Sequence, residues 1–245
     1  MIEPKIIFEN DDVMVIDKPC GLAVHADGPD ASGTVVEWFL RLAPSAKGVG
    51  EPRVGRDGAM IERSGVVHRL DRDTSGVMVL AKTQEAFDFL KGQFLERSVK
   101  KEYRAFVYGA MKERWGTIDR SIGRSAKDWR RRSAERGARG TLRPAMTEWE
   151  TIRSGEYAGE KFSFLKLRPK TGRQHQLRAH LKSIGRPIVA DSLYAGNLLG
   201  KGENLGLNRL ALHSLSLHIV LPTGESREFQ APLPTELKEA LGRIA

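Results

Sequence analysis

The stretch that decides how this chain folds is VVHRLDRDTSGVMVLAK, residues 66–82. Val66 and Val67 have the character of a strand that ends there, and the apolar run 77–81 is typical of a second, buried strand. Between them lie mostly charged and turn-forming residues, more than a plain hairpin needs. The pattern predicts a scaffold of strands that presents a reactive loop.

A second polar stretch, TGRQHQLRAHL, occupies residues 171–181. Leu177, Leu181 and Ile184 are spaced for one face of a helix, and the glycine and proline that follow end it. This spacing predicts that Arg178 lies in the second turn of a helix that follows a strand. The two histidines are five residues apart, so they do not share a helix face as paired zinc ligands would.

The strings HRLDRDTSG and TGRQHQLRAHL together resemble the two signatures of the RluA-type pseudouridine synthases, a family that converts uridine within RNA to pseudouridine. Three further segments resemble parts of the same family: KPCGLAVH at 18–25, KEYRAFVYG at 101–109 and PIVADSLY at 187–194. The chain departs from the family pattern at Gln174, where threonine is common, and at Ala190, where glycine is usual. The resemblance covers nearly the entire chain.

In this family the aspartate of the HRLD group is catalytic, which corresponds to Asp71. The resemblance further implies that Arg178 forms an ion pair with Asp71 and that Tyr103 lies against the target base. A guanidinium beside a carboxylate removed from water opposes its neutralisation, so Asp71 would stay ionised. We expect RNA contacts from residues of both motifs: Arg69, His68, Arg72, Thr74, Arg173 and His175. For Arg69, an ion pair with Asp73 is an equally supported alternative.

We expect an α+β fold, with a mixed, mostly antiparallel sheet flanked by helices and loops and with the central active-site cleft that the resemblance implies. Periodicity predicts helices near 34–42 and 83–97, the second capped by its first threonine. Residues 1–245 should form a single catalytic domain without a separate N-terminal RNA-binding domain. This domain should contain a loop at 43–65 and a basic insertion at 112–145.

Forty lysines and arginines outnumber thirty-one aspartates and glutamates, which gives a formal net charge of +9. Residues 120–143 contain nine basic and two acidic residues and so carry +7 of that excess. Such a run is commonly a solvated loop. Beside motifs that resemble an RNA-modifying family it predicts phosphate contacts, which we assign to Arg130, Arg131 and Arg132. A segment so rich in charge can stay disordered until RNA binds.

The composition is that of an ordinary globular protein, with 40% hydrophobic and 29% charged residues among 245. The N-terminus is acidic where a signal peptide is basic and then apolar, and no apolar run reaches the length of a membrane span. We therefore expect a cytoplasmic monomer with no membrane partner. The single cysteine, Cys20, cannot form an internal disulfide or a thiolate metal cluster.

Converting uridine to pseudouridine breaks the N-glycosidic bond, rotates the uracil and rejoins it through carbon five, with no electrons or atoms from outside. We therefore expect no cofactor, no nucleotide and no metal, and the sequence contains no Walker loop or dinucleotide fingerprint. The expected partner is a structured ribosomal or transfer RNA, from which the target base must be flipped. The sequence leaves the chemical route at the sugar open.

Two other functions are consistent with parts of the sequence. The triplet Asp71-Arg72-Asp73 has the DxD form with which metal-dependent glycosyltransferases hold a divalent cation. A non-catalytic RNA-binding or RNA-chaperone protein is the second alternative, since it could keep the same pocket without turnover. The joint presence of Asp71, Tyr103 and Arg178 favours the enzyme.

Overall fold

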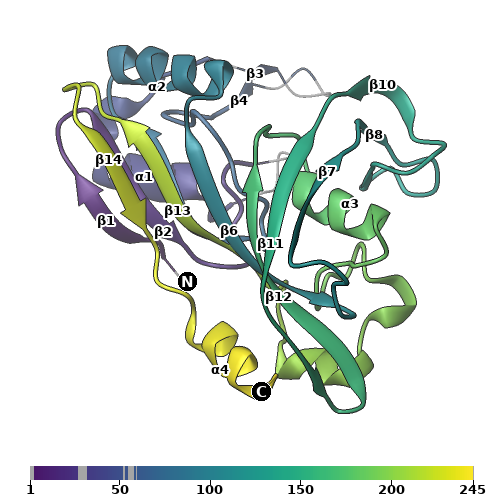
Figure 1. The fold of residues 1–245 in the computed structure, drawn as a ribbon. Helices are drawn as coiled ribbons and strands as arrows, with labels where there is room; N and C mark the ends of the chain where they lie inside the picture. The colour runs from purple at the N-terminus through teal and green to yellow at the C-terminus, as the bar shows by residue number, and fades with distance from the viewer. Residues whose placement is uncertain (1–2, 27–31, 52, 55–57, 59, 245) are drawn as a thin grey trace. The chain divides into compact units, whose positions relative to one another are not determined.

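The computed structural model describes residues 3–26, 32–51, 53–54, 58 and 60–244 (Figure 1). The chain divides into two units, of which the first contains residues 1–101 and 214–232 and the second contains residues 102–213 and 233–245. Both units are built on antiparallel strands with few helices, which confirms the predicted α+β class. Among the helices in the described ranges, none has the length and hydrophobicity that a membrane span requires.

The first unit has the strand order β1-β2-β5-β13, with β14 paired to β13. The bounds of these strands are Lys5–Glu9 (β1), Val13–Lys18 (β2), Ser75–Ala81 (β5), Leu212–Val220 (β13) and Ser226–Gln230 (β14). Strand β5 is buried along its whole length and pairs with β2, with Met78 opposite Ile16. Because both faces of β5 are covered, its sequence after Gly76 is continuously apolar instead of alternating.

Two helices belong to the first unit, α1 (Val35–Leu42) and α2 (Gln84–Glu96). Each begins at a threonine whose hydroxyl accepts a hydrogen bond from the amide three residues on, at 3.2 Å for Thr34 and 3.1 Å for Thr83. These caps satisfy amides that have no partner within the helix. Both helices were predicted from the sequence, and the structure confirms them with their boundaries.

The segment 43–65, which we expected to be a loop, contains three short regular elements. They are a 3₁₀ turn at Pro44–Ala46 (η1) and the paired two-residue strands Arg53–Val54 (β3) and Met60–Ile61 (β4). The part of the prediction that concerns residues 52, 55–57 and 59 lies outside the described residues. The rest of the described part of this segment is irregular, as expected for a loop.

The second unit has the strand order β6-β12-β11-β7. Its strands are Lys100–Tyr108 (β6), Glu160–Pro169 (β12), Met146–Tyr157 (β11) and Trp115–Asp119 (β7). Its helices are Gln176–Ser183 (α3) and Thr235–Arg243 (α4), with 3₁₀ turns at Gly196–Leu198 (η2) and Lys201–Gly206 (η3). Ala105 and Leu165 from the strands pack with Leu177 and Leu181 of α3 in one buried cluster. Helix α4 was not predicted; it buries only Leu237 and Ala240 in the middle of a polar sequence.

The basic insertion is folded, which differs from the disorder that its composition allows. It forms a small sheet in the order β10-β8-β9, from Arg139–Arg143 (β10), Ile122–Arg124 (β8) and Arg132–Ser133 (β9). Figure 1 labels β8 and β10 of this sheet. A cluster of buried residues that includes Ile122, Ala134 and Tyr194 lies beneath it. This small apolar base supplies the burial that a uniformly charged loop would lack.

His68 contacts the middle of strand β5 and helix α2. Its Nε2 accepts a hydrogen bond from the Val79 amide at 3.1 Å, and its ring stacks on Phe94 with centroids 4.6 Å apart. Burial, and to a smaller degree the charge of Lys101, lowers the pKa of His68 to about 3. The imidazole is therefore neutral at physiological pH, and its Nδ1 carries the hydrogen.

Gly76, the second residue of β5, marks a close approach to β13. Its φ is +115°, and a Cβ atom at this position would lie 2.1 Å from the carbonyl oxygen of Ser214. Only glycine satisfies both the left-handed backbone and this contact.

We predict that Gly76→Ala lowers the free energy of unfolding by about 1–3 kcal/mol, because the methyl group forces β5 and β13 apart. The matched control is Gly92→Ala within α2, where a Cβ meets nothing within 4 Å. The control should gain about 0.5–1 kcal/mol from helix propensity. Urea unfolding of the three proteins measures both effects, and equal midpoints for Gly76→Ala and wild type would contradict the close approach.

We predict that His68 makes folding stability depend on pH below neutrality. The folded pKa of about 3 lies below the ordinary value of 6.5, so only the unfolded chain gains this proton as the pH falls between these values. The contribution of His68 is present above pH 6.5 and is lost progressively on acidification. Urea unfolding between pH 7.5 and 4.5 should show a shallower loss of stability for His68→Gln than for wild type. Parallel curves would show that His68 takes up its proton in the folded protein.

Candidate active site

The loop between Val66 and β5 presents Asp71 at a tight turn. The Thr74 amide donates to the carbonyl of Asp71 at 3.1 Å, which closes the turn. Asp71 is half-buried, Arg72 is exposed and Thr74 is buried. The predicted reactive loop is therefore an ordered turn whose acidic side chain is partly removed from solvent.

Lys18, the last residue of β2, hydrogen-bonds to this loop. Its side chain is fully buried, and Nζ donates to the carbonyls of Pro19 at 2.9 Å, Leu22 at 2.8 Å and Arg72 at 2.9 Å. Three carbonyl oxygens match the three N–H donors of an ammonium group. This role of Lys18 was not predicted from the sequence, where the segment 18–25 was only noted for its family resemblance. The signal was a lysine that ends an otherwise buried strand.

The turn that follows Lys18 lies directly against the loop. The Gly21 amide donates to the carbonyl of Arg72 at 3.0 Å, and Arg72 Nε donates to the carbonyl of Gly21 at 3.0 Å. The thiol of Cys20 donates to the carbonyl of Asp73 at 3.0 Å. Cys20 is half-buried and acts here as a hydrogen-bond donor to the loop that carries Asp71.

Arg69, two residues before Asp71, contacts His25, which follows the turn at residues 18–21. Its Nη1 lies 2.9 Å from Nε2 of His25, whose side chain is buried. Arginine can only donate, so Nε2 accepts and Nδ1 carries the hydrogen that it gives to the carbonyl of Ala26 at 3.0 Å. His25 is therefore a packed, hydrogen-bonded residue that orients Arg69.

In the second unit, Tyr103 lies on β6 opposite Leu167 of β12. It is half-buried and packs against the cluster that contains Ala105 and Leu165. The alternation of the strand therefore points Tyr103 to the apolar face of the sheet. Its neighbour Arg104 lies on the opposite face, where it forms an ion pair with Glu102 at 2.7 Å.

Arg178 is the third residue of α3, so it lies in the first turn of the helix and not in the second turn that we predicted. It is 4% exposed and makes a bidentate contact with Asp191, with Nε to Oδ2 and Nη2 to Oδ1 both at 2.7 Å. This geometry is the strong, fork-like form of an arginine–carboxylate pair. A guanidinium has five N–H donors, so the contact with Asp191 does not exhaust them.

Asp191 is the residue that sequence analysis missed in the second unit. It is 1% exposed, and its Oδ1 also accepts from the amides of Leu193 at 3.0 Å and Tyr194 at 3.1 Å. Ala190 before it has a φ of +56°, the left-handed region that favours glycine, which explains why glycine is usual there in the family that the motif resembles. The signal in the sequence was the aspartate of PIVADSLY.

The remaining predicted RNA contacts lie around the start of α3 and on the basic insertion. Arg173 Nε donates to the carbonyl of Pro144 at 3.2 Å, and His175 has a left-handed φ of +54°. Arg130 and Arg131 both pair with Asp128, at 2.8 Å and 3.2 Å. The hydrogen bond from Arg130 lowers the pKa of Asp128 to about 2, so this carboxylate stays ionised.

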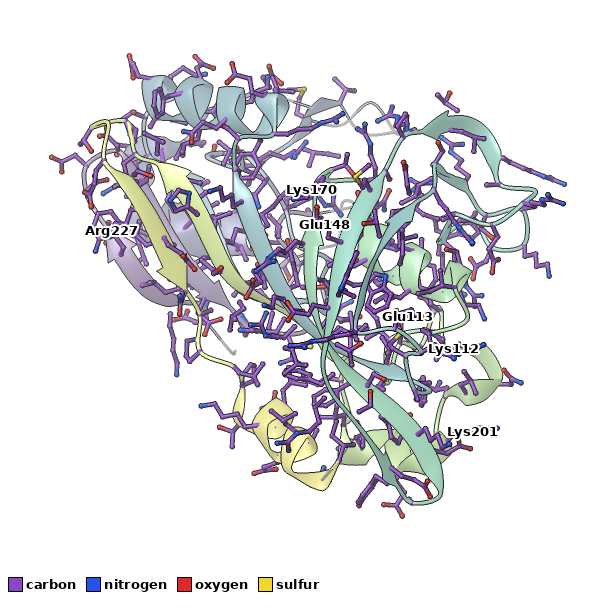
Figure 2. The ribbon with its side chains drawn as sticks, viewed as in Figure 1. Lys112, Glu113, Glu148, Lys170, Lys201 and Arg227 are labelled. Carbon is purple, nitrogen blue, oxygen red and sulfur yellow. The ribbon has the colours of Figure 1, made fainter. Side chains whose placement is uncertain are left out.

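The charges of the basic insertion differ from those on the neighbouring sheet. On that sheet, Glu148 and Lys170 lie next to each other (Figure 2) with Nζ and Oε2 2.9 Å apart, and Lys166 pairs with Glu150 at 2.7 Å. In the insertion, by contrast, strand β10 is exposed throughout and contains two arginines and no acid. Trp129, in the connection between β8 and β9, is 79% exposed and offers a flat face on which a base can stack.

Asp71 belongs to the first unit, whereas Tyr103 and Arg178 belong to the second. Within the first unit the structure brings Asp71 together with the turn at 18–21. Within the second it brings Arg178 together with Asp191 and His175. The contact of Asp71 with Arg178 and Tyr103 stays a prediction. The RNA contact of His68 also stays a prediction, and the structure shows this residue hydrogen-bonded to β5.

Comparisons with known proteins agree with these observations. The chain matches the RNA pseudouridylate synthase family over residues 12–183. It is 35% identical over 241 residues to an uncharacterized RNA pseudouridine synthase of Synechocystis, which covers 96% of this chain and 67% of that protein. It is 36% identical over 251 residues to ribosomal large subunit pseudouridine synthase D of Xanthomonas campestris, which covers 98% of this chain and 69% of that protein.

The fold is also similar to a solved structure, that of human RNA pseudouridylate synthase domain containing 1. The TM-score is 0.73 at 28% sequence identity, over 95% of this chain and 84% of that one. The family match includes both the loop of Asp71 and the first turns of α3. The prediction of the RluA-type family is therefore confirmed, and this chain belongs to the RNA pseudouridylate synthases, isomerases that act on RNA.

Proposed function

We propose that this chain converts specific uridines of structured ribosomal or transfer RNA to pseudouridine, with Asp71 as the catalytic carboxylate. The observation that carries this proposal is the way in which Asp71 is presented. It is half-buried on a turn whose carbonyls at Arg72 and Asp73 are held by Lys18 and Cys20. A catalytic side chain must be held within about 0.5 Å of its productive position, and a loop fixed by buried donors meets that need.

Arg178 is proposed to hold Asp71 in its ionised form. Burial would otherwise favour the neutral acid, and a guanidinium near a carboxylate opposes this. The bidentate contact with Asp191 restricts the rotamers of Arg178, so less entropy is lost when it engages a second carboxylate. Tyr103 is proposed to stack on the target uracil, which suits its half-buried position at the edge of an apolar cluster.

The reaction needs little beyond these groups. The bond from C1′ to N1 breaks, the uracil rotates, and a bond from C1′ to C5 forms. The proton on C5 leaves and N1 gains one, so atoms and electrons balance without an external reagent. We therefore propose that the enzyme works without a cofactor or metal, as a monomer in which the whole chain acts as one catalytic domain.

The RNA is proposed to lie on the basic insertion. Exposed arginines there, together with the exposed face of Trp129, combine phosphate contacts with a stacking platform. Flipping a uridine out of a folded RNA costs a few kcal/mol, which contacts around the vacated position must offset. Arg69, exposed and oriented by His25, is proposed for that position. The names of relatives such as ribosomal large subunit pseudouridine synthase D point first to ribosomal RNA.

We predict that Asp71→Asn abolishes pseudouridine formation, by at least about 10³-fold in single turnover, while RNA affinity changes less than about threefold. Asparagine keeps the size of the side chain and removes the charge that the reaction uses. Primer extension after carbodiimide treatment of total RNA, from cells with and without this gene, identifies the uridine to be assayed. Wild-type activity should persist in EDTA with a prefolded RNA.

Two results would contradict the proposal on Asp71. Measurable turnover by Asp71→Asn would show that another group does the chemistry. Absence of pseudouridine from every RNA exposed to the wild type would favour a binding protein without turnover. Loss of wild-type activity in EDTA would instead indicate a metal-dependent reaction.

We predict that Arg136→Ala, Arg139→Ala and Arg143→Ala together reduce the salt dependence of RNA binding. Each phosphate contact contributes roughly 0.7–0.9 to the slope of log K against log salt, so the slope should fall by about 2. The control replaces Lys5, Lys47 and Lys238, which are exposed elsewhere, and removes the same charge. Filter binding between 50 and about 200 mM salt measures the slopes. Equal slopes for the two triple variants would assign the effect to net charge and not to the insertion.

A further inference from the structure

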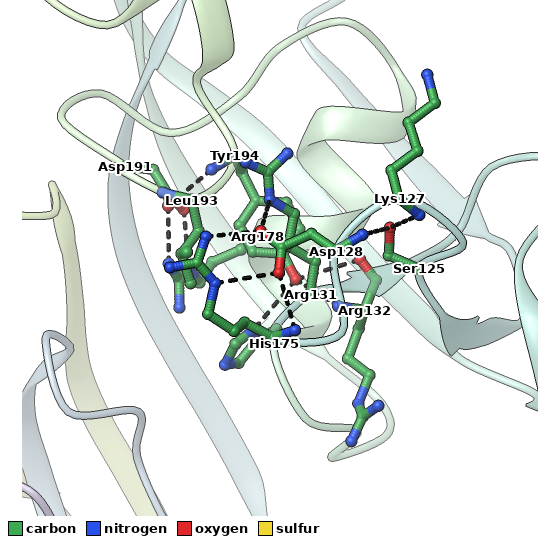
Figure 3. Close-up of polar contacts among 11 residues, drawn as sticks. Ser125, Lys127, Asp128, Arg131, Arg132, His175, Arg178, Asp191, Leu193 and Tyr194 are labelled. Atoms are coloured by element: carbon green, nitrogen blue, oxygen red, sulfur yellow. Dashed lines mark hydrogen bonds and ion pairs between the residues drawn. The ribbon is translucent and has the colours of Figure 1, made fainter.

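Tyr194 had no assigned role in the sequence, yet it lies between the basic insertion and Arg178 (Figure 3). Its side chain is 3% exposed. One face of its ring lies 5.0 Å from the guanidinium carbon of Arg178, and its hydroxyl reaches β9 of the insertion. A single buried side chain therefore contacts both the proposed RNA surface and the proposed partner of the catalytic carboxylate.

The hydroxyl of Tyr194 binds both backbone polar atoms of Arg132. The Arg132 amide donates to it at 2.8 Å, and the hydroxyl lies 3.2 Å from the Arg132 carbonyl, to which it donates. Nδ1 of His175 lies 3.0 Å from the same oxygen. A hydroxyl has one hydrogen and two lone pairs, so Nδ1 of His175 must be the donor in that contact. The first residue of β9 is thus fixed by a group outside the insertion.

The side chain of Arg132 is held at the same place. Its Nε donates to Oε1 of Gln174 at 3.0 Å, and Nη2 contacts the same oxygen. Gln174 and His175 are adjacent in the sequence, immediately before α3. Backbone and side chain of Arg132 therefore both attach to the segment that leads into the helix of Arg178.

The carboxylate of Asp191 connects the backbone of Tyr194 to the side chain of Arg178. Its Oδ1 accepts from Arg178 Nη2 and from the Tyr194 amide, at 2.7 Å and 3.1 Å. The group that orients Arg178 is thus also bonded to the backbone of Tyr194. Movement of β9 would be transmitted to Arg178 through one hydroxyl, one ring and one carboxylate, all buried.

We propose that Tyr194 is a positioning residue that couples the basic insertion to Arg178, so that RNA held by the insertion fixes the arginine in the geometry that the reaction needs. The inference rests on the proposed function, because it uses RNA on the insertion and the proposed role of Arg178. It adds that RNA binding and catalysis are linked through this hydroxyl, and that Tyr194 acts through Arg178 without touching the target base.

The test uses Tyr194→Phe, which keeps the ring over Arg178 and removes only the hydroxyl. The single-turnover rate on saturating, prefolded RNA should fall about tenfold, the effect of losing one buried hydrogen bond of about 1.4 kcal/mol, while RNA affinity changes less than threefold. The matched control is Tyr157→Phe, because the Tyr157 hydroxyl makes a long, exposed contact with Glu203 at 3.4 Å. The control should keep the wild-type rate.

A second variant, Gln174→Met, removes the side-chain contact of Arg132 at an exposed position. It keeps the proposal testable if Tyr194→Phe does not fold. It should also lower the rate. Since both variants act on Arg132, the double variant should be slowed no more than the slower single variant within about twofold. Rates that multiply would show that the two residues act independently and would overturn the coupling.

Hydrogen exchange gives a readout that does not need turnover. The amides of residues 131–133 should exchange faster in Tyr194→Phe than in wild type or Tyr157→Phe. RNA binding should slow exchange at residues 191–194 in wild type but not in Tyr194→Phe. If wild type forms no pseudouridine, the proposed function fails while these two comparisons still decide the coupling.

Three outcomes would overturn the proposal. The first is a wild-type rate in Tyr194→Phe. The second is an equal loss of rate and affinity in that variant, which would make Tyr194 a binding residue only. The third is unchanged exchange at residues 131–133 and 191–194, which would show that the hydroxyl transmits nothing.

Discussion

The buried ammonium of Lys18 is the interaction on which the first unit depends. Removing such a charge from water costs several kcal/mol unless its donors are matched, and carbonyls of Pro19, Leu22 and Arg72 match them. The first two lie next to Lys18, but Arg72 lies 54 residues away. The ammonium can be satisfied only if the turn after β2 and the loop before β5 converge, so the requirement to solvate one charge fixes the backbone around Asp71.

The second unit also contains a buried positive charge, but here a carboxylate and not backbone carbonyls stabilises it. Arg178 is a buried cation, and Asp191 neutralises it with two short hydrogen bonds. The carboxylate of Asp191 also accepts hydrogen bonds from the amides of Leu193 and Tyr194 in the turn that follows it. These bonds together restrict the rotation of the carboxylate. In both units a buried charge with hydrogen-bonded partners fixes the region of a proposed site residue, which is the preorganisation that the proposed reaction needs.

The sequence predicted those features whose causes are local. Turn-forming charges between apolar runs predicted the loop of Asp71, apolar spacing predicted helix α1, and Thr83 predicted where helix α2 begins. The roles of Lys18 and Asp191 escaped prediction because their partners are distant in the chain, or are backbone groups that no residue type reveals. Helix α4 escaped because two buried residues in nine are too few for a clear period. What depends on a long-range contact was visible only in the structure.

The composition of the basic insertion left open whether the segment is ordered, and the structure shows what folds it. Its charge density favours disorder, since repulsion among arginines opposes compaction. Three contacts oppose this repulsion. Ile122 and Ala134 are buried in one cluster with Tyr194, and Asp128 forms ion pairs with two arginines. The Tyr194 hydroxyl hydrogen-bonds to the backbone amide and carbonyl of Arg132. A surface folded in this way would not lose backbone entropy on binding the RNA that we propose for it. Under that proposal its arginines present a fixed pattern to the phosphates, so that the shape of the RNA, and not only its charge, should determine how well it binds.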